Sequence, residues 1–296
     1  MTTKTGMIAI VGRPNVGKST LLNALLGEKL AIVSKKPQTT RTRITGVLTQ
    51  GDTQYVFLDT PGMHHPKTRL GDRMVRSVRD TILGVDAAIL VVEPNSQVGD
   101  IEMGLLERCK KNELPVLLVI NKTDVFSREA VGQTIAAYSK VFDFVSVIPV
   151  CAMKNQGISI VLTECRPLLH EGAWMFEEDA ITDLPERQIA AEIIREKLLR
   201  LLDEEIPHGT AVVIESFTEE KAMLRIRAEI FCEKESHKGI IIGKGGATLK
   251  KIGTYAREDM EIFFDTKVFL DLWVKVKENW RDSVTMLNQF GFRAEE

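Results

Sequence analysis

Two short segments near the start of the chain carry residue types that bind phosphate and magnesium. The first extends from Gly12 to Ser19, has the spacing GxxxxGK(S/T) and directly follows an apolar run. In this pattern, backbone N–H groups of a glycine-rich turn surround phosphate oxygens, and the following helix adds partial positive charge at its N-terminus. Lys18 would reach the β- and γ-phosphates, and the Ser19 hydroxyl would bind Mg²⁺. A glycine turn that only caps a helix is the weaker interpretation, because the lysine and serine are both in place.

The second segment, residues 59–62, reads Asp-Thr-Pro-Gly and follows another short apolar run. Asp59 ends that run and is placed to hold Mg²⁺, through a water molecule, while Gly62 lets the next peptide N–H approach a γ-phosphate. Together the two segments predict a site for a nucleoside triphosphate with its magnesium ion.

A polar stretch between them, residues 36–41, is rich in turn formers and holds two adjacent threonines. A threonine there can bind Mg²⁺ only while the γ-phosphate is present, which is how a loop becomes a nucleotide-dependent switch. Residue types alone do not separate Thr39 from Thr40.

A third segment, Asn121-Lys122-Thr123-Asp124, predicts that the base is guanine. The Asp124 carboxylate can accept both the N1–H and the exocyclic amine of guanine, an arrangement that adenine does not offer. Asn121 would connect this loop to the phosphate-binding turn, and Lys122 would lay its alkyl stem along the base. Alone, the four residues would be a plain turn, but here they follow an apolar run about 100 residues after the phosphate-binding turn. The first half of the chain therefore predicts a GTPase.

The elements that must position these segments alternate along the first 170 residues. Short apolar runs typical of buried strands alternate, after the first glycine turn, with amphipathic stretches typical of helices. The predicted strands are residues 7–11, 55–58, 87–92, 116–120 and 145–150, and the predicted helices are 18–26, 70–83, 99–111, 128–141 and 158–169. This order predicts a mostly parallel α/β sheet with helices on both faces and ligands at the carboxyl ends of its strands.

The alternation ends near residue 170, and a second domain follows. Residues 186–203 form an amphipathic helical pattern, and two strand patterns at 210–217 and 224–232 follow it. A helix, a glycine turn at 243–246, a second helix, a strand at 267–276 and a last helix from Glu278 complete the predicted order. Trp273 and Trp280 lie on apolar segments, so we expect them to pack in the core or between domains rather than stack on bases.

The glycine turn at 243–246 has the form GxxG between two helices, as in KH modules that clamp about four nucleotides of single-stranded nucleic acid. Residues 234–257 hold six Lys or Arg residues against one acidic residue, a net +5 in a chain of net charge −2. Because phosphate contacts dominate the affinity of such sites, this patch is a candidate RNA-binding surface. Its candidate residues are Lys234, Lys238, Gly243, Lys244, Gly245, Gly246, Lys250 and Lys251.

Composition sets limits on the other functional classes. A length of 296 residues favours two domains, and the near-neutral net charge favours only local patches for nucleic acid. The four scattered cysteines lack CxxC spacing, so we expect neither a zinc site nor a disulfide framework but thiols in a reducing cytosol. No run of 18 apolar residues is present, so we expect no membrane-spanning segment, and residues 1–10 lack the long apolar stretch expected of a signal peptide.

The chain resembles the Era-like family of TRAFAC-class GTPases along nearly its whole length. The matching segments are residues 12–20, 37–43, 59–62, 121–124, 184–186 and the specific tail stretch 269–281, FLDLWVKVKENWR. The resemblance implies a P-loop GTPase domain at 1–172, a linker at 173–185 and a type II KH domain of α+β class at 186–296. It also implies Thr40 as the switch threonine, because the family places that threonine directly before an arginine.

Two positions depart from common GTPase patterns. Where the family usually has Ser-Ala in its guanine loop, this chain has Cys151-Ala152, whose Ala152 N–H can still meet guanine O6. Met63 stands where Ras-like GTPases have a glutamine that orients the attacking water, so we expect slow intrinsic turnover. His64 and His65 are tempting substitutes, although adjacent exposed histidines are more often bystanders. The resemblance offers Asn15 as a ligand for an activating K⁺ ion.

The predicted site residues fall into three overlapping groups. Candidate GTP-binding residues are Gly12, Arg13, Pro14, Asn15, Val16, Gly17, Lys18, Ser19, Thr20, Asp59, Thr60, Pro61, Gly62, Asn121, Lys122, Asp124, Cys151 and Ala152. Candidate catalytic residues are Lys18, Thr40, Gly62 and Asn15, and candidate Mg²⁺ ligands are Ser19, Thr40 and Asp59.

The resemblance implies a monomeric cytoplasmic GTPase that grips the 3′ end of small-subunit ribosomal RNA and acts in 30S subunit maturation. One alternative is a peripheral GTPase on the inner face of the membrane, acting in envelope or cell-cycle processes through the 186–203 helix or the basic patch. Another is a passive RNA-binding protein that uses nucleotide only structurally. Lys18 and Asp59 beside a switch-like stretch make this last alternative the weaker one.

Overall fold

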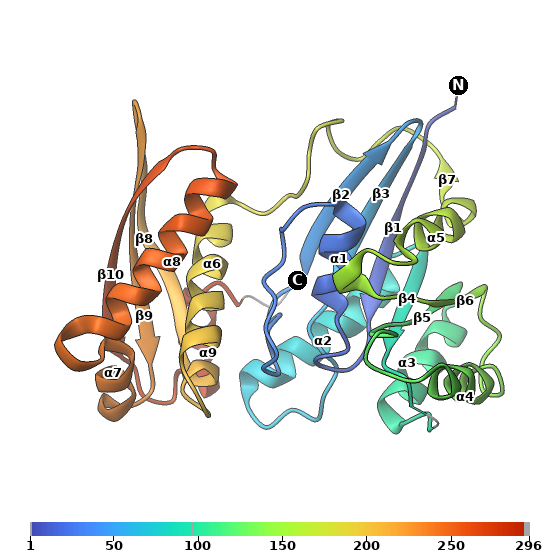
Figure 1. Cartoon of the computed structure of the whole chain (residues 1–296), viewed down its shortest axis with the longest axis horizontal. Helices are drawn as coiled ribbons and strands as arrows, with labels where there is room; N and C mark the ends of the chain where they lie inside the picture. Colours follow the sequence, from blue (N-terminus) through green and yellow to red (C-terminus); the bar gives the residue numbers. More distant parts are fainter. Residues whose placement is uncertain (1, 96, 293–296) are drawn as a thin grey trace. The chain divides into compact units, whose positions relative to one another are not determined.

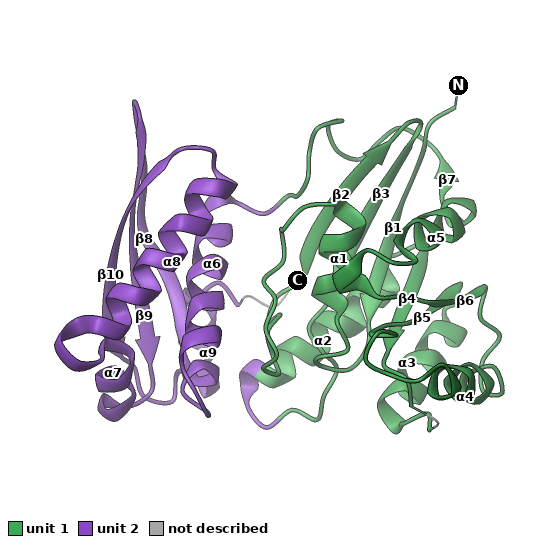
Figure 2. Cartoon of the chain, in the orientation of Figure 1, with its two compact units in different colours: residues 1–66, 71–183 green, residues 67–70, 184–296 purple. Residues whose placement is uncertain are grey.

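Alternating strands and helices in the first part of the chain form one mixed sheet with helices on both faces (Figure 1). The computed structural model describes residues 2–95 and 97–292. Contacts divide the chain into two compact units, residues 1–66 with 71–183 and residues 67–70 with 184–296 (Figure 2). The predicted fold class, a P-loop-type α/β domain followed by an α+β domain, is confirmed.

The first unit is built on a sheet with the strand order β2-β3-β1-β4-β5-β6. β1, β3, β4, β5 and β6 are mutually parallel, whereas β2 pairs antiparallel with β3, and β7 pairs antiparallel with β1. The strands are β1 (Lys4–Val11), β2 (Ile44–Gln50), β3 (Thr53–Asp59), β4 (Ala87–Val92), β5 (Val116–Ile120), β6 (Ser146–Pro149) and β7 (His170–Glu171). In this register Ile10 lies opposite Asp59, so the first two predicted segments leave neighbouring strands at the same edge.

The strands β2 and β7 were not predicted. β2 lies at the sheet edge and joins β3 through a tight turn at Gly51, whose φ of 63° is left-handed. Its sequence, ITGVLTQ, is a short run that follows the polar stretch directly, so no separate strand pattern stands out. β7 has only two residues and exists because of its pairing with β1.

Helices cover both faces of this sheet. α2, α3 and α4 pack on one face through a cluster that includes Val78, Leu105 and Tyr138, and α1 and α5 lie on the other (Figure 1). The helices are α1 (Lys18–Leu26), α2 (Arg69–Leu83), α3 (Asp100–Lys111), α4 (Arg128–Tyr138) and α5 (Ile158–Cys165). The helix predicted to reach residue 169 ends at Cys165, because Pro167 lies in a short 3₁₀ turn there.

Residues 173–183 are attached to the first unit by hydrogen bonds. The Gln54 side chain accepts from the backbone N–H groups of Met175 and Phe176 and donates to the Phe176 carbonyl. Val47 N–H donates to the Ile181 carbonyl at 2.9 Å, and the Thr45 hydroxyl donates to Asp183 at 3.1 Å. Most of the segment expected to be a linker is thus ordered along β2 and β3.

The second unit follows the predicted order of helix, two strands, two helices and strand. Its sheet has the order β10-β9-β8, with β8 antiparallel and β10 parallel to the central β9. The elements are α6 (Glu186–Leu201), β8 (Ala211–Glu220), β9 (Met223–Cys232), α7 (Glu235–Ile242), α8 (Ala247–Phe263), β10 (Lys267–Val276) and α9 (Val284–Gln289). Their apolar residues form one core cluster.

Two predictions for the tail of the chain were wrong. The last helix begins at Val284 rather than at Glu278, because Asn279 adopts a left-handed φ of 52° and a 3₁₀ turn follows it. Trp273 is 56% exposed, whereas Trp280 is fully buried and its indole N–H donates to the Gly209 carbonyl at 2.9 Å. Only Trp280 therefore packs in the core as expected.

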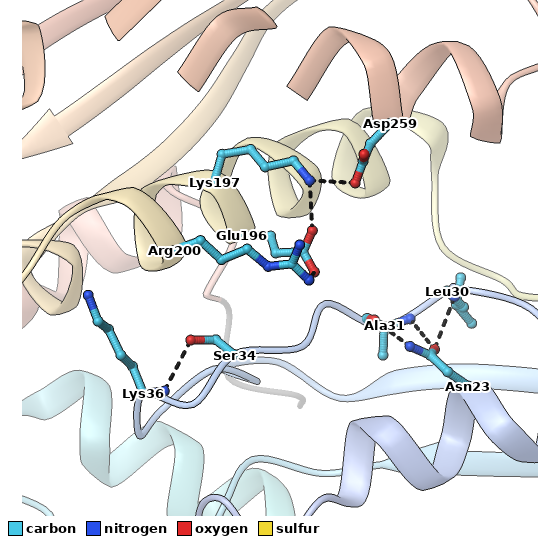
Figure 3. Close-up of polar contacts among 9 residues, drawn as sticks. All are labelled: Asn23, Leu30, Ala31, Ser34, Lys36, Glu196, Lys197, Arg200 and Asp259. Carbon is cyan, nitrogen blue, oxygen red and sulfur yellow. Dashed lines mark hydrogen bonds and ion pairs between the residues drawn. The ribbon is translucent and has the colours of Figure 1, made fainter. Parts of the chain in front are cut away.

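The apolar stripe of α6 packs inside the second unit. Ile189, Ile193, Ile194, Leu198 and Leu202 all belong to its buried core cluster. This helix also buries charge (Figure 3): Glu196, fully buried, accepts from Lys197 at 3.0 Å and Arg200 at 2.8 Å, and Lys197 also pairs with Asp259 on α8. Buried charges need such partners, and of these pairs the one between Lys197 and Asp259 joins α6 to α8.

Candidate functional site

A glycine-rich turn connects β1 to the N-terminus of α1. Gly12 and Gly17 have φ values of 146° and 96°, a region that favours glycine. A Cβ atom on Gly12 would lie 2.4 Å from the Val91 carbonyl oxygen, and one on Gly17 would lie 2.3 Å from the Asn121 side chain. Neither position can therefore carry a side chain without moving the turn. The tight turn that these glycines allow brings its backbone N–H groups together.

Lys18 is a buried cation inside this turn. Its Nζ donates to the carbonyl oxygens of Gly12 at 3.3 Å and Arg13 at 3.0 Å. Burial lowers the pKa of Lys18 to about 8, and the charge of Asp59 only partly opposes this effect. An anion bound in the turn would favour the charged form of this lysine.

Three oxygen-bearing side chains meet beside the turn, as expected of magnesium ligands. The Ser19 hydroxyl lies 2.6 Å from Asp59 Oδ2 and 2.8 Å from the Thr40 hydroxyl, and Thr40 lies 3.4 Å from the same carboxylate oxygen. Thr39 instead donates to the Lys36 carbonyl at 2.7 Å. The geometry therefore distinguishes the two threonines that the sequence left open, and it favours Thr40.

The carboxylate of Asp59 has fewer hydrogen-bond partners than it can accept. Its side chain is fully buried, burial raises its pKa to about 6, and its Oδ1 atom has no hydrogen-bond partner. Hydroxyl and carboxylate oxygens are ligands that Mg²⁺ prefers, so an unpaired carboxylate oxygen beside two hydroxyls fits this ion. The residues present thus match the requirements of a magnesium site.

The segment after Asp59 is folded against the glycine-rich turn. The Thr60 hydroxyl donates to the Ile10 carbonyl at 2.8 Å, so this side chain braces the strand edge. A Cβ atom on Gly62 would lie 2.6 Å from Pro14 Cα, and Met63 N–H donates to the Gly12 carbonyl at 3.1 Å. Only glycine allows this close approach of the two segments.

His64 connects the two segments expected to act as switches. Its Nδ1 lies 2.9 Å from the Gly62 carbonyl oxygen, and its Nε2 lies 3.3 Å from the Gln38 side-chain nitrogen. His65 is exposed. The two adjacent histidines, which the sequence does not separate, therefore have different surroundings, and only His64 contacts the polar stretch at 36–41.

The third segment and residues 151–152 lie side by side at the ends of β5 and β6. Asn121 donates to the Val16 carbonyl at 3.0 Å and accepts from Ala152 N–H at 3.1 Å, so it connects all three loops. Asp124 is exposed, and a hydrogen bond from the Cys151 thiol, followed by Lys154 at 3.1 Å, lowers its pKa. An ionised carboxylate at this position is suited to guanine, whose N1–H and exocyclic amine are both donors.

Sequence patterns missed the acidic partners of two basic residues at this site. Arg13 forms a two-point ion pair with the buried Glu102 of α3, at 2.5 and 2.7 Å. Lys122 Nζ donates to the Asn15 carbonyl at 2.6 Å and pairs with Glu93. No motif marks these glutamates, because each comes from a different loop or helix that only the fold brings near. The side chain of Asn15 is exposed.

The glycine turn at 243–246 separates α7 from α8 in the second unit. Gly243, Gly245 and Gly246 all have left-handed φ values, of 73°, 58° and 80°. A Cβ atom on Gly243 would lie 2.2 Å from the Thr248 hydroxyl, whereas Gly245 and Gly246 have open space around them. The outer half of the turn is thus open to close approach by another backbone.

The basic residues predicted for RNA surround this turn. Lys244 lies in the turn, Lys234 and Lys238 at the start of α7, and Lys250 and Lys251 in the first two turns of α8. All are exposed except Lys238, which is half-buried. Two side chains that the sequence did not single out, Ile240 and Tyr255, are also exposed here, and Lys251 lies over the Tyr255 ring at 5.7 Å.

Among the residues that the structure describes, no helix is both long and apolar enough to cross a bilayer. Within the same residues, no group of three or more His, Cys, Asp or Glu could hold a metal ion. A magnesium site built from Ser19, Thr40 and Asp59 is compatible with this finding, because two of its three side chains are hydroxyls.

Comparisons with known proteins match both units. Residues 7–122 match the model of a family described as 50S ribosome-binding GTPase, and residues 205–281 match the KH domain model. The chain is 49% identical over 294 residues to GTPase Era of Ruminiclostridium cellulolyticum, covering 99% of both chains. It is 50% identical over 291 residues to GTPase Era of Clostridium kluyveri, covering 98% of this chain and 99% of the relative.

Two solved Era structures match nearly the whole chain. One is Aquifex aeolicus Era, as a point variant, bound to GDP and AlF4⁻, with a TM-score of 0.94 and 38% identity over 98% of this chain and 99% of that one. The other is Era in complex with MgGDPNP and nucleotides 1506–1542 of 16S ribosomal RNA, with a TM-score of 0.93, 37% identity and the same coverage. With near-complete mutual coverage and about half of its residues identical to the curated relatives, the chain belongs to the GTPase Era family.

Proposed function

We propose that this chain is a GTP-hydrolysing switch that binds the 3′ end of small-subunit ribosomal RNA and assists biogenesis of the 30S subunit. The observation that carries the proposal is the likeness, over 98% of the chain, to Era in complex with MgGDPNP and a 16S ribosomal RNA fragment. The two candidate sites in this chain fit the same two ligands. The alternative of a peripheral membrane GTPase is not favoured, because the apolar stripe of α6 is buried in its own unit.

In the proposed nucleotide site, the turn at 12–17 and the N-terminus of α1 hold the phosphates. Lys18 is already buried beneath them and would neutralise charge on the β- and γ-phosphates. Ser19, Thr40 and Asp59 would hold Mg²⁺, which stabilises negative charge that develops on the phosphate oxygens. Because Thr40 comes from the polar stretch and Gly62 from the segment after β3, both would respond to loss of the γ-phosphate.

We propose that Asp124 selects guanine and that Asn121 and Ala152 place its loop. A site built to hydrogen-bond a base rejects an analogue that lacks the matching groups by about 10⁴-fold or more. Lys122 keeps its stem near the base through its contacts with Asn15 and Glu93. The Cys151 thiol keeps its neighbour Asp124 ionised, which is the form that guanine needs.

The proposed nucleotide site has no glutamine at position 63 to orient the attacking water. Met63 has no group that could orient the attacking water, and its side chain is half-buried against the α2–α3–α4 face. We propose that K⁺, held in part by the exposed Asn15 side chain, takes the place of an arginine finger and stabilises the charge of the transition state. Hydrolysis in potassium chloride should then exceed hydrolysis in sodium chloride at equal ionic strength, and Asn15→Ala should remove the difference while Asn112→Ala keeps it. Equal wild-type rates in both salts would contradict this role.

In the proposed RNA site, the open turn at 243–246 approaches the sugar–phosphate backbone, and the surrounding lysines neutralise its charge. GTP would favour the RNA-binding form, and hydrolysis would release the RNA, to the extent that the two forms differ in affinity for each ligand.

The test is crosslinking of the GTP-bound protein to RNA in cells, followed by sequencing of the attached RNA. We expect enrichment of the last nucleotides of the small-subunit ribosomal RNA. Lys244→Gln combined with Lys250→Gln should reduce that enrichment, whereas Lys221→Gln, an exposed lysine in the β8–β9 turn, should leave it unchanged. Recovery of RNA without enrichment at that 3′ end would contradict the proposed function. The same protein mixed with anionic liposomes should not sediment with them.

A further inference from the structure

A cavity of about 740 Å³ lies between α2 and α3 of the first unit, separate from the nucleotide site. One end is formed by the residues that follow Gly62, and the long sides are formed by the two helices. Its lining consists of Met63, His64, His65, Pro66, Asp72, Val75, Arg76, Arg79, Asp100, Ile101, Gly104, Glu107, Arg108 and Lys111. The volume is in the range of pockets that hold small organic ligands.

The charges in this cavity are unevenly distributed. α2 and α3 each follow a strand of the parallel sheet and so run in the same direction. Asp72 and Asp100 lie in their first turns, where the helix dipole favours acidic groups. Further along the helices the cavity is lined by four cations, Arg76, Arg79, Arg108 and Lys111, and by one carboxylate, Glu107.

The four cations outnumber the one carboxylate, Glu107, in this part of the cavity. Within residues 2–95 and 97–292, none of them forms an ion pair. Burial, and then the charge of Arg76, lower the pKa of the neighbouring Arg73. The helix dipole accounts for Arg108 and Lys111, in the last turn of α3, but not for Arg76 and Arg79, in the middle of α2. Such a cluster attracts phosphate groups, which arginine binds through paired hydrogen bonds.

The cavity lining also includes apolar residues and free space beside α3. Met63, Val75 and Ile101 contribute apolar surface, and Gly104 lies in the interior of α3 with open space where a Cβ atom would be. An apolar surface next to a phosphate-binding end is the combination that a nucleotide requires, because its base stacks and its phosphates are anionic.

The cavity is connected to the hydrolysis machinery through one short segment. His64 lines the cavity and contacts Gly62 and Gln38, and Met63 lines it and donates its N–H to the Gly12 carbonyl. A ligand that contacts this wall would favour one conformation of residues 62–66 over others, and so bias the proposed switch.

We propose that the α2–α3 cavity binds a phosphate-bearing small molecule of nucleotide size and that its occupancy changes the rate of GTP hydrolysis. The proposal that a ligand binds depends only on the cavity and its lining. The proposal that binding changes hydrolysis also rests on the proposed function.

The probe is ADP, added to full-length protein whose guanine site is saturated with GDP and Mg²⁺. Asp124 disfavours adenine in the guanine site, so ADP binding reports on a second site. We expect calorimetry to show one ADP per chain, and amide chemical shifts to change in α2, α3 and residues 62–66. Inorganic pyrophosphate should compete with ADP. Absence of ADP binding at millimolar concentrations, or binding of pyrophosphate without ADP, would overturn the proposal.

Two glycine substitutions provide a matched pair. Gly104→Leu should fill the cavity and abolish ADP binding, and because Gly104 lies in a helix interior with free space, the protein should remain folded. Gly132→Leu, in the interior of α4 and likewise facing open space, should leave binding unchanged. Arg79→Gln should weaken ADP binding about tenfold through loss of one charge-assisted hydrogen bond, whereas Lys110→Gln should not.

Hydrolysis of GTP, measured with and without ADP, supplies the second readout. We expect ADP to change the wild-type rate at least about twofold, in line with a modest coupling free energy, and to leave the rate of Gly104→Leu unchanged. If ADP binds but Gly104→Leu binds it equally well, the cavity is not the site. If ADP binds in the cavity and the rate does not change, the regulatory part fails. Absence of hydrolysis without any ADP would instead contradict the proposed function, which keeps the two failures distinct.

Discussion

The candidate nucleotide site and the candidate RNA site of this chain are built in opposite ways. In the first, Lys18 and Asp59 are buried, and the three proposed magnesium ligands contact one another. In the second, Gly245 and Lys244 face solvent. The first site is preorganised by the protein interior, whereas the second is an open turn surrounded by mostly exposed side chains.

This difference determines how much each residue can contribute. A buried polar group without a partner costs more than an exposed one, so single residues of the nucleotide site should each have large effects. Exposed lysines contribute mainly through screened phosphate contacts, so the RNA site should lose affinity in small, salt-dependent steps.

The largest effect is expected from Asp124→Asn. The ratio of affinities for GTP and xanthosine triphosphate should shift toward the latter by about 10⁴-fold, because the asparagine no longer accepts both guanine donors. Competition binding with the two nucleotides measures the shift. Unchanged GTP preference would exclude Asp124 as the specificity residue.

Lys18→Met should lower the hydrolysis rate by about 10²- to 10³-fold, as expected for loss of one charged group that stabilises the transition state. Single-turnover hydrolysis of bound GTP measures the effect. The nucleotide-free variant should be no less stable than the wild type, since burial already disfavours the Lys18 charge. Lys110→Met, at an exposed lysine of α3, is the control and should hydrolyse GTP at the wild-type rate.

Asp59→Asn should stabilise the nucleotide-free protein while weakening binding of the Mg²⁺–nucleotide complex. The pKa of Asp59 rises from 3.8 in the unfolded chain to about 6 in the folded protein. The folded state therefore binds more protons between these values, and the free energy of unfolding falls as pH rises through that window. At pH 7, in EDTA and without nucleotide, the variant should be more stable by about 1–3 kcal/mol, and the gain should shrink near pH 4.

Urea denaturation at the two pH values measures this difference. Binding of the Mg²⁺–nucleotide complex should weaken in the same variant. A less stable nucleotide-free variant at pH 7 would show that Asp59 is fully compensated within the protein, and the contrast between the two sites would lose its main support.

The smallest effect is expected from Lys244→Gln. Affinity for a single-stranded RNA from the small-subunit 3′ end should fall several-fold, and the slope of log affinity against log salt should decrease by about 0.7, the value for one phosphate contact to a single strand. Titrations at several salt concentrations measure both. Lys221→Gln should change neither. A loss as large as that of Lys18→Met would contradict the open, additive nature of this site.

Much of the fold could be predicted because its patterns are local. Apolar runs such as those at β4 and β5, and the amphipathic pattern of α2, reflect side chains that each face a core. The strand β2 was missed because a short edge strand depends on its pairing with β3 rather than on its own pattern. The last helix was misplaced because the left-handed turn at Asn279 has no strong signal in sequence.

In the candidate nucleotide site, too, only the features that depend on neighbouring residues could be predicted from the sequence. The glycine-rich turn and the guanine loop have characteristic spacing, because their chemistry requires particular residues close together in the chain. The partners Glu102 and Glu93 have no such spacing and come from distant elements. Trp273 was expected in packing but is exposed on the sheet, since alternation along β10 places it on the face opposite Val274.

By itself, the sequence determined the nucleotide chemistry, the guanine preference and the presence of a GxxG turn, because each depends on neighbouring residues. Only the tertiary structure decided that Thr40 rather than Thr39 meets Ser19 and Asp59, that one oxygen of Asp59 is left without a partner, and that four cations line a cavity between α2 and α3. These features depend on which distant segments are buried together, and burial is a property of packing rather than of spacing along the chain.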